Sequence, residues 1–421
     1  MHRRDVVLTR SVIAALAVIV VGLTVCWTGL RSLPGRHPAS GPPVQVPPGA
    51  GPATPEPGLD GREGAGPAPA SPSPSETASP PGPSASPRAP AKRCTVGTKL
   101  VPTCGVLWGV AAGAHTERRG RVALREFEKR TGRTQAIFHA YHRGANGVFP
   151  TRQEKALAQE PGRPRILFLN WKPTGASWAR IARGHTRTDR FLDRLARHIR
   201  TTYPERFFFT VHHEPEDDVR PRRGSGYTAR DYAAMFRHVV QRLRAGGVDN
   251  LVTVMVHLAY APLTSRPWFE QMYPGDDVVD WVGFDTYAYS EPGYGHGDFA
   301  ELVNRRSGGR GQWPGFYNWA AGRYPGKPLM VAEWGVWHSR DNPDHMARFY
   351  RSVGSQINWF PRIKALVHFD TPNNQKGWDS RVDRTREGLA AYRQLGALPV
   401  FRVGLGPLRP TLAGLVRPGL P

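Results

Sequence analysis

The chain has 421 residues and a formal net charge of +23, and this length exceeds what one ordinary domain requires. Eight of its 57 basic residues are lysines. The arginines lie in short runs without interleaved aromatic residues, which argues against nucleic-acid binding. The chain has three cysteines, and the nine residues between Cys94 and Cys104 are not a spacing typical of zinc ligands. Instead, Cys94 and Cys104 are predicted to form a disulfide that closes a small loop outside the cell.

The amino-terminal region carries a candidate membrane segment. Residues 11–30 contain no charged side chain and are long enough to span a bilayer as a helix. Arg3, Arg4 and Arg10 precede this run, so the amino end is expected in the cytoplasm. We predict that residues 1–32 form a cytoplasmic stub and an uncleaved signal anchor, with a cleaved signal peptide as the alternative. The protein is then expected at the cell membrane with its remainder outside, or secreted if the anchor is cleaved.

Residues 33–92 are rich in Pro, Ser, Ala and Gly. Such a segment buries too little apolar surface to offset its ordering entropy, so we predict a disordered linker. Residues 402–421, rich in Pro, Gly and Leu, form a tail to which the sequence assigns no role.

Residues 93–401 alternate strand-like apolar runs with amphipathic helical patterns, such as those at 189–203 and 229–247. Eight β/α alternations predict an α/β fold, a (β/α)₈ TIM barrel. A doubly wound open sheet is the alternative, but no Gly-rich phosphate loop follows the first strand. The predicted strands are 106–110, 135–141, 166–171, 206–213, 251–256, 278–284, 328–334 and 365–369.

Two carboxylates end strands of this predicted barrel, Glu214 after the fourth and Glu333 in the seventh. Active sites of such barrels lie at the carboxyl ends of the strands. A protonated carboxyl can donate its proton to a leaving glycosidic oxygen while an ionised one attacks the sugar, so the pair predicts glycoside hydrolysis. A separation of about 5–5.5 Å between the carboxyl groups would indicate retention of configuration.

Other polar and aromatic side chains stand near the same strand ends. Asp217 and Asp218 are expected on a solvated loop. Neighbouring strand residues point to opposite faces, so His212 and His213 are not expected to share an ion, and neither a metal nor another cofactor is predicted. The predicted substrate-binding residues are His213, Tyr287, Asp285, Trp171, His139, His142, Trp334 and Trp337.

The region from about 104 to 395 resembles glycoside hydrolase family 26, whose β-mannanase-like members are retaining (β/α)₈ barrels. The resemblance implies that Glu214 is the acid/base, that Glu333 is the nucleophile and that Tyr287 orients it. It also implies a β-linked polysaccharide substrate, β-mannan or a related glycan. The matching residues are His213-Glu214, Asp280-Trp281-Val282-Gly283 with Asp285 and Tyr287, and the run 327–335.

The sequence departs from the family pattern at two strand ends. Residues 215–218 read Pro-Glu-Asp-Asp where the family usually has Asn-Gly, and residues 368–370 read His-Phe-Asp where a Trp-rich motif is common. Two alternatives therefore stay open: a catalytically impaired, wall-facing carbohydrate-binding barrel, and an enzyme that trims the cell's own exopolysaccharide. The chain is expected to be a monomer.

Overall fold

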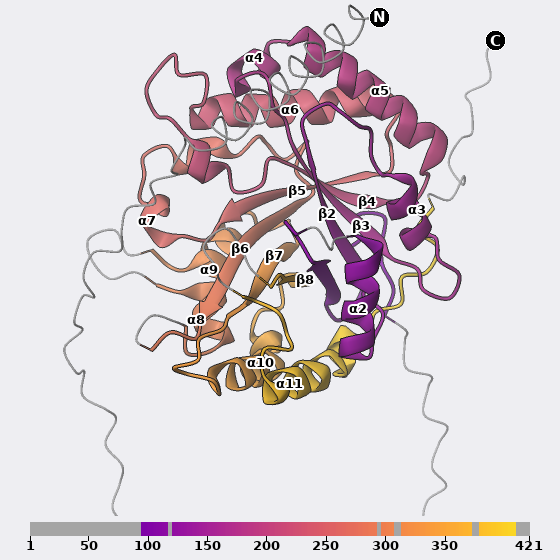
Figure 1. Cartoon of the computed structure of the whole chain (residues 1–421). Helices are drawn as coiled ribbons and strands as arrows, with labels where there is room; N and C mark the ends of the chain where they lie inside the picture. Colours follow the sequence, from indigo (N-terminus) through magenta and orange to yellow (C-terminus); the bar gives the residue numbers. More distant parts are fainter. Residues whose placement is uncertain (1–93, 117–119, 293–295, 307–312, 373–378, 410–421) are drawn as a thin grey trace, which may run out of the picture. The chain divides into compact units, whose positions relative to one another are not determined.

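The computed structural model describes residues 94–116, 120–292, 296–306, 313–372 and 379–409. In this part of the chain eight parallel strands close into a barrel in sequence order, because β1 pairs with both β2 and β8. Figure 1 shows helices surrounding the strands. The predicted (β/α)₈ barrel is therefore confirmed, and the open doubly wound sheet is wrong.

The elements follow one another in the expected alternation. The strands are β1 (Leu107–Ala112), β2 (Ile137–Arg143), β3 (Ile166–Lys172), β4 (Phe207–Val211), β5 (Leu251–Leu258), β6 (Trp281–Tyr289), β7 (Leu329–Trp337) and β8 (Ile363–Asp370). The helices are α2 (Arg121–Thr131), α3 (Arg152–Ala158), α4 (Trp178–Ala182), α5 (Thr186–Thr202), α6 (Ala229–Ala245), α7 (Ala261–Thr264), α8 (Phe299–Asn304), α9 (Phe316–Arg323), α10 (His345–Gln356) and α11 (Arg386–Gly396). Short 3₁₀ turns are η1 (Pro215–Asp218), η2 (Phe269–Met272), η3 (Ile357–Trp359) and η4 (Pro399–Phe401).

The apolar core has two layers because alternate strand side chains point in opposite directions. On β3, Ile166 and Phe168 face the barrel interior, whereas Leu167 and Leu169 pack in the layer between strands and helices. Trp281 also belongs to the interior cluster. This alternation decides which polar side chains can point into the space inside the carboxyl ends of the strands, here called the barrel opening.

The long helices follow from their sequence patterns. In α5 the buried positions include Phe191, Leu195 and Ile199, a spacing of one turn that places them on one face. Helix α6 begins at a capping box in which Thr228 and Asp231 exchange side-chain-to-backbone hydrogen bonds, and Gly246 is its C-cap.

The amino ends of the strands form one face of the barrel, here called the amino-end face, and this face is covered. Cys94 and Cys104 form a disulfide, and Leu100 within the loop they close is fully buried against the interior cluster. Leu405 and Leu408 join the same cluster. The first residues of the tail that the sequence left without a role, up to 409, therefore help to close the barrel at this face.

Removing the disulfide is expected to destabilise the barrel, because the link restricts the unfolded chain. For a loop of this size the free energy of unfolding should fall by about 2–3 kcal/mol in the double variant Cys94→Ser, Cys104→Ser. Urea denaturation monitored by circular dichroism measures this change. Reduced wild-type protein is the control and should unfold at the same midpoint as the variant. An unchanged midpoint in the double variant would contradict the prediction.

Among the residues described here, no helix is long and apolar enough to span a bilayer. The predicted signal anchor at 11–30 and the predicted linker at 33–92 lie outside the described residues. Both stay predictions.

Candidate active site

Glu333 enters the barrel opening because β7 contains a bulge. Its pairing with β6 runs from Phe284–Val331 directly to Asp285–Glu333, so Ala332 is an extra residue. Ala332 already faces the interior, and strict alternation would turn the next side chain outward. The bulge instead directs Glu333 inward, where it is 4% exposed.

Two phenols hold the Glu333 carboxylate. Tyr141 on β2 donates a hydrogen bond to Oε1 over 2.6 Å, and Tyr287 on β6 donates one to Oε2 over 2.5 Å. Burial raises the pKa of Glu333 to about 7, and the two phenol hydrogen bonds oppose this rise. Hydrogen bonds to the charged form of a carboxyl group favour that form. The two phenols therefore keep the pKa of Glu333 lower than burial alone would make it.

Glu214 reaches the same opening through an unusual backbone after β4. His212 and Glu214 both have positive φ values, 54° and 51°, in a region that non-glycine residues rarely occupy. This turn sends the His212 side chain outward to Trp178 and Asp218. His213 points inward, toward both candidate carboxylates.

His213 lies between the two carboxylates. Its Nε2 is 3.8 Å from Oε2 of Glu214 and 3.6 Å from Oε1 of Glu333, so the oxygens can be no farther apart than these two distances together. Its Nδ1 contacts the side-chain amide of Asn170. Burial lowers the pKa of His213 to about 3, so the ring is neutral. An amide N–H donated to Nδ1 leaves the ring proton on Nε2, facing the carboxylates.

The environments of the two glutamates differ in a way that separates their roles. Burial, and then the negative charge of Glu333, raises the pKa of Glu214 well above its usual range. The two phenol donors favour the ionised form of Glu333, and the charge of that form acts on the neighbouring Glu214. Ionisation of Glu333 therefore favours a protonated Glu214, the arrangement that an acid and a nucleophile require.

Asp285 on β6 is the third carboxyl group of this site. It is 1% exposed, and neither of its oxygens forms a side-chain hydrogen bond. Burial, followed by the charges of Glu333 and Glu214, raises its pKa well above the usual range. One oxygen each of Asp285 and Glu333 and one nitrogen of His213 lie within 4.8 Å of one another, a ligand set that a divalent metal accepts. The prediction that no cofactor is needed stays a prediction.

Two of the tryptophans predicted to bind substrate do not reach the opening. Trp171 stacks on Phe191 of α5 with ring centroids 5.3 Å apart, and its Nε1 donates to the carbonyl of Gly144. Trp334 is fully buried and packs edge-on against Trp108. Both occupy strand positions that face the helices, so these predictions were wrong.

The predicted role of His142 is wrong for the same reason. Its ring stacks on Phe149 with centroids 4.3 Å apart, and its Nε2 lies 3.1 Å from Oε1 of Glu154, which forms a capping box with Thr151 at the start of α3. His139, two residues earlier, does face inward. It lies beneath Tyr141, with Nδ1 3.2 Å from the phenol oxygen, and is 3% exposed. It supports Tyr141 from below and does not line the opening.

Aromatic side chains form one wall of the site. Trp337 packs on Tyr287 with ring centroids 4.8 Å apart and also contacts Phe369. Tyr141 belongs to the same group and was missed as a functional residue. A signal for it existed, because Tyr141 follows Ile137 and His139 at alternate positions and so shares their inward direction.

The acidic residues after Glu214 are only partly solvated. Asp217 is exposed, as expected. Asp218 instead accepts from Lys172 over 2.6 Å and contacts Nε2 of His212 at 2.7 Å. Glu216 is buried and contacts His257.

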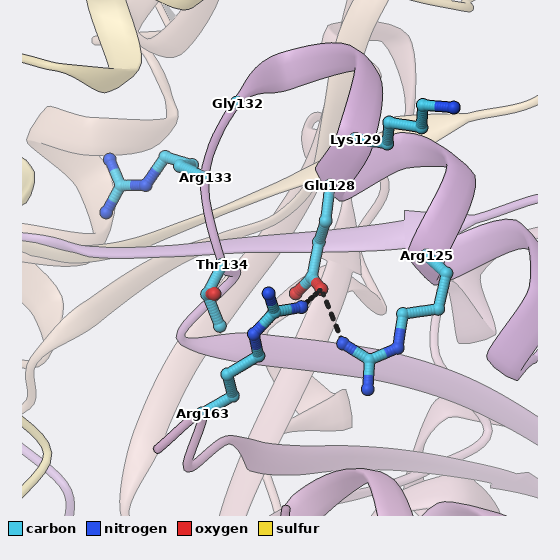
Figure 2. A pocket seen from close by; sticks show the side chains of 7 residues that line it. All are labelled: Arg125, Glu128, Lys129, Gly132, Arg133, Thr134 and Arg163. Atoms are coloured by element: carbon cyan, nitrogen blue, oxygen red, sulfur yellow. Dashed lines mark hydrogen bonds and ion pairs between the residues drawn. The ribbon is translucent and has the colours of Figure 1, made fainter.

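A separate hollow of about 310 Å³ lies at the carboxyl end of α2, toward the amino-end face and away from Glu333. Figure 2 shows Arg125 and Arg163 directed at Glu128, while Arg133 and Lys129 point away from it. Arg125 and Arg163 in its lining are paired with Glu128. Because the hollow lies away from Glu333, it is not part of the candidate active site. The lining residues are Arg125, Glu128, Lys129, Gly132, Arg133, Thr134 and Arg163.

Comparison with known proteins supports the predicted resemblance. Residues 207–308, which hold Glu214, Asp285 and Tyr287, match the model of glycosyl hydrolase family 26. Endoglucanase H of Acetivibrio thermocellus is 26% identical over 303 residues, covering 69% of this chain and 30% of that protein. Beta-1,3-xylanase TXYA of a Vibrio species is 42% identical over 110 residues, covering 26% of this chain and 20% of that protein. The chain thus spans less than a third of the length of these curated relatives.

A solved structure supports the fold. The GH26 β-mannanase from Bacteroides ovatus superposes with a TM-score of 0.50 at 14% identity, covering 72% of this chain and 91% of that one. At this identity the likeness concerns the barrel alone. The relatives' names include an endoglucanase, a xylanase and a mannanase, so they do not specify one sugar.

Proposed function

We propose that this chain, related to glycosyl hydrolase family 26 through residues 207–308, is a retaining glycosidase that cleaves β-linked polysaccharide through a covalent glycosyl-enzyme. One observation carries the proposal: Glu333 is held by two phenols beside a second carboxyl, Glu214, whose pKa is raised. This is the pairing of an ionised nucleophile with a protonated acid that retaining hydrolysis requires. The substrate class is β-mannan or a related β-glycan.

The reaction follows from these positions in two balanced steps. Oε of ionised Glu333 attacks the anomeric carbon while Glu214 transfers its proton to the departing glycosidic oxygen, leaving a glycosyl ester on Glu333. Water then attacks the same carbon, Glu214 takes a proton from it, and the ester bond to Glu333 breaks. The ring of His213 is neutral and carries its proton on Nε2, which faces both carboxylates. This N–H favours the charged form of Glu333 before the first step and that of Glu214 after it has given up its proton.

The stereochemistry of the first product tests the mechanism. Proton NMR during early turnover of a β-linked oligosaccharide should show the β-anomer of the new reducing end before it mutarotates. Early appearance of the α-anomer would indicate inversion and contradict the proposal. A panel of β-mannan, β-1,3-xylan and mixed-linkage β-glucan, with released reducing ends as the readout, identifies the preferred sugar.

The alternative of an impaired carbohydrate-binding barrel rested on the altered residues after Glu214. Those residues leave Glu214, His213 and Glu333 close together, which favours an active enzyme. A 2-fluoro glycoside with a good leaving group separates the two readings, because it labels Glu333 covalently only if the nucleophile works. The third reading, trimming of the cell's own exopolysaccharide, stays a prediction.

Removing either phenol from Glu333 is expected to shift the acidic limb of the pH profile. Activity requires ionised Glu333, and Tyr141→Phe or Tyr287→Phe removes a hydrogen bond that favours this form. The pKa of Glu333 then rises, so activity is lost at a higher pH on the acid side, by about one unit for a charge-assisted hydrogen bond. The measurement is kcat/KM against pH. Tyr203→Phe, on a buried tyrosine outside the site, is the control and should keep the wild-type limb.

We also propose that the barrel acts outside the cell as a monomer, tethered through residues 11–30. The absence of charge in that run and the arginines before it support this proposal. Full-length protein expressed in cells should sediment with membranes, whereas a chain starting at residue 33 should not. External protease should reach the barrel in intact cells. Recovery of the full chain in the soluble fraction would contradict the tether.

A further inference from the structure

The turn that follows Glu214 is fastened to the neighbouring strand by a buried carboxylate. The Glu216 side chain has no exposed surface, and its Oε1 lies 2.6 Å from Nδ1 of His257 on β5. Its Oε2 accepts a hydrogen bond of 3.1 Å from the backbone N–H of Leu258, the last residue of β5. A buried carboxylate is stable only when it is paired in this way. The turn is therefore fixed to the carboxyl end of β5.

The other end of the turn is fastened to the opposite side. Asp218 contacts Lys172 on β3 at 2.6 Å and Nε2 of His212 at 2.7 Å. Trp178 donates its indole N–H to Nδ1 of the same His212 over 3.1 Å. This histidine therefore presents its remaining N–H to Asp218. Two acidic residues two positions apart thus bind elements on either side of β4.

Glu214 comes directly before this turn, and its backbone has a conformation that is unfavourable unless neighbouring groups stabilise it. Its φ of 51° and ψ of 50° are left-handed, and its N–H donates to the carbonyl of Val256 on β5. Such a conformation in a non-glycine residue persists when the surroundings determine it. The contacts of Glu216 and Asp218 supply those surroundings.

We propose that Glu216 is a positioning residue for the acid/base Glu214: by binding His257 and the backbone of Leu258 it fixes the turn against β5 and so holds the left-handed backbone of Glu214 in place. This inference rests on the proposed function. It gives a role to the Pro-Glu-Asp-Asp run, which departs from the family pattern and by sequence alone suggested an impaired site.

The charge of Glu216 acts together with the other groups that face Glu214. Burial, and after it the charges of Glu333, Asp217 and Glu216, raise the pKa of Glu214, and the charge of Lys172 lowers it. Of the three acids, Asp217 is exposed to solvent, which screens its charge, whereas Glu216 is buried. The other ionisable groups facing Glu214 are His213 after β4, Tyr141 of β2, and Asp285 and Tyr287 of β6.

Two variants separate the charge of Glu216 from its hydrogen bonds. In Glu216→Gln the side-chain oxygen still accepts from Leu258 and the amide still reaches His257, but the charge is gone. The pKa of Glu214 should then fall, so the alkaline limb of kcat/KM moves to lower pH by roughly half a unit to one unit, with kcat below the limb nearly unchanged. In Glu216→Ala the hydrogen bonds are lost too, and kcat should fall about ten- to a hundredfold with little change in KM.

The chain contains a matched control in Glu154, which lies 3.1 Å from Nε2 of His142 in a pair facing the helices. Glu154→Ala should lower the melting temperature and leave kcat and both pH limbs at wild-type values. The inference is overturned if Glu216→Ala behaves like Glu154→Ala, or if Glu216→Gln loses as much kcat as Glu216→Ala. A wild-type chain without hydrolytic activity would overturn the proposed function instead. Carbon-13 NMR titration of the Glu214 carboxyl would then still decide whether Glu216 raises its pKa.

Discussion

Replacing Glu333 by glutamine is expected to lower kcat by at least about a thousandfold, because no glycosyl-enzyme can form without the attacking carboxylate. Glutamine has nearly the same shape, and its oxygen can still accept from one of Tyr141 and Tyr287. The barrel should therefore fold and bind oligosaccharide. Steady-state kinetics on the best polysaccharide gives kcat, and calorimetry with a short oligosaccharide gives the affinity.

The control for this variant is Glu270→Gln, which removes a half-exposed carboxylate paired with Arg323 on the outside of the barrel. It should turn over substrate at the wild-type rate. In wild-type protein treated with the 2-fluoro glycoside, mass spectrometry should place the label on the peptide that contains Glu333. Normal turnover by Glu333→Gln, or a label on another carboxylate, would refute the nucleophile assignment.

Replacing Glu214 by alanine should produce a loss that depends on the leaving group. A sugar oxygen needs a proton as it departs, so hydrolysis of polysaccharide should fall by about a hundred- to ten-thousandfold. A dinitrophenolate leaves without a proton, so dinitrophenyl glycosides should still form the glycosyl-enzyme. Water activation in the second step is then slow, and stopped-flow absorbance should show a burst of dinitrophenolate followed by slow turnover.

Azide provides the control for the Glu214 variant, because it is an anion that attacks the glycosyl-enzyme without a general base. It should speed the slow phase of Glu214→Ala and yield a β-glycosyl azide, while wild-type protein should respond little. The alkaline limb of the pH profile should also disappear, since the group that titrates there is gone. An equal loss on polysaccharide and dinitrophenyl substrates would contradict the acid/base role.

The sequence was sufficient to predict the barrel and the proximity of Glu214 and Glu333 at one end of it, because buried parallel strands have long apolar runs and their last residues meet at one end. Glu214 and Glu333 could be found from that rule alone. It does not state which way each neighbouring side chain points. Trp171 and Trp334 were assigned to the opening, although each occupies a position that faces the helices.

What the sequence could not supply depends on local departures from regular geometry and on contacts between distant residues. The bulge at Ala332 changes the direction of every later residue of β7, and no residue type marks it. Tyr141 lies 192 positions from the carboxylate it holds. Glu216 is an ordinary loop acid by local pattern, and it becomes a buried anchor only because β5 presents His257 and a free N–H at that point.

The amino-end face has a further consequence for how the protein can be fixed to a surface. The backbone of Cys94 is held there by a hydrogen bond to Gly404, so anything joined ahead of this residue attaches at the end of the barrel opposite Glu333. If the proposed function holds, a support or tag joined directly to this residue leaves the barrel opening free for a long or insoluble polymer. Coupling through side chains around the barrel opening would instead restrict the protein to short soluble oligosaccharides.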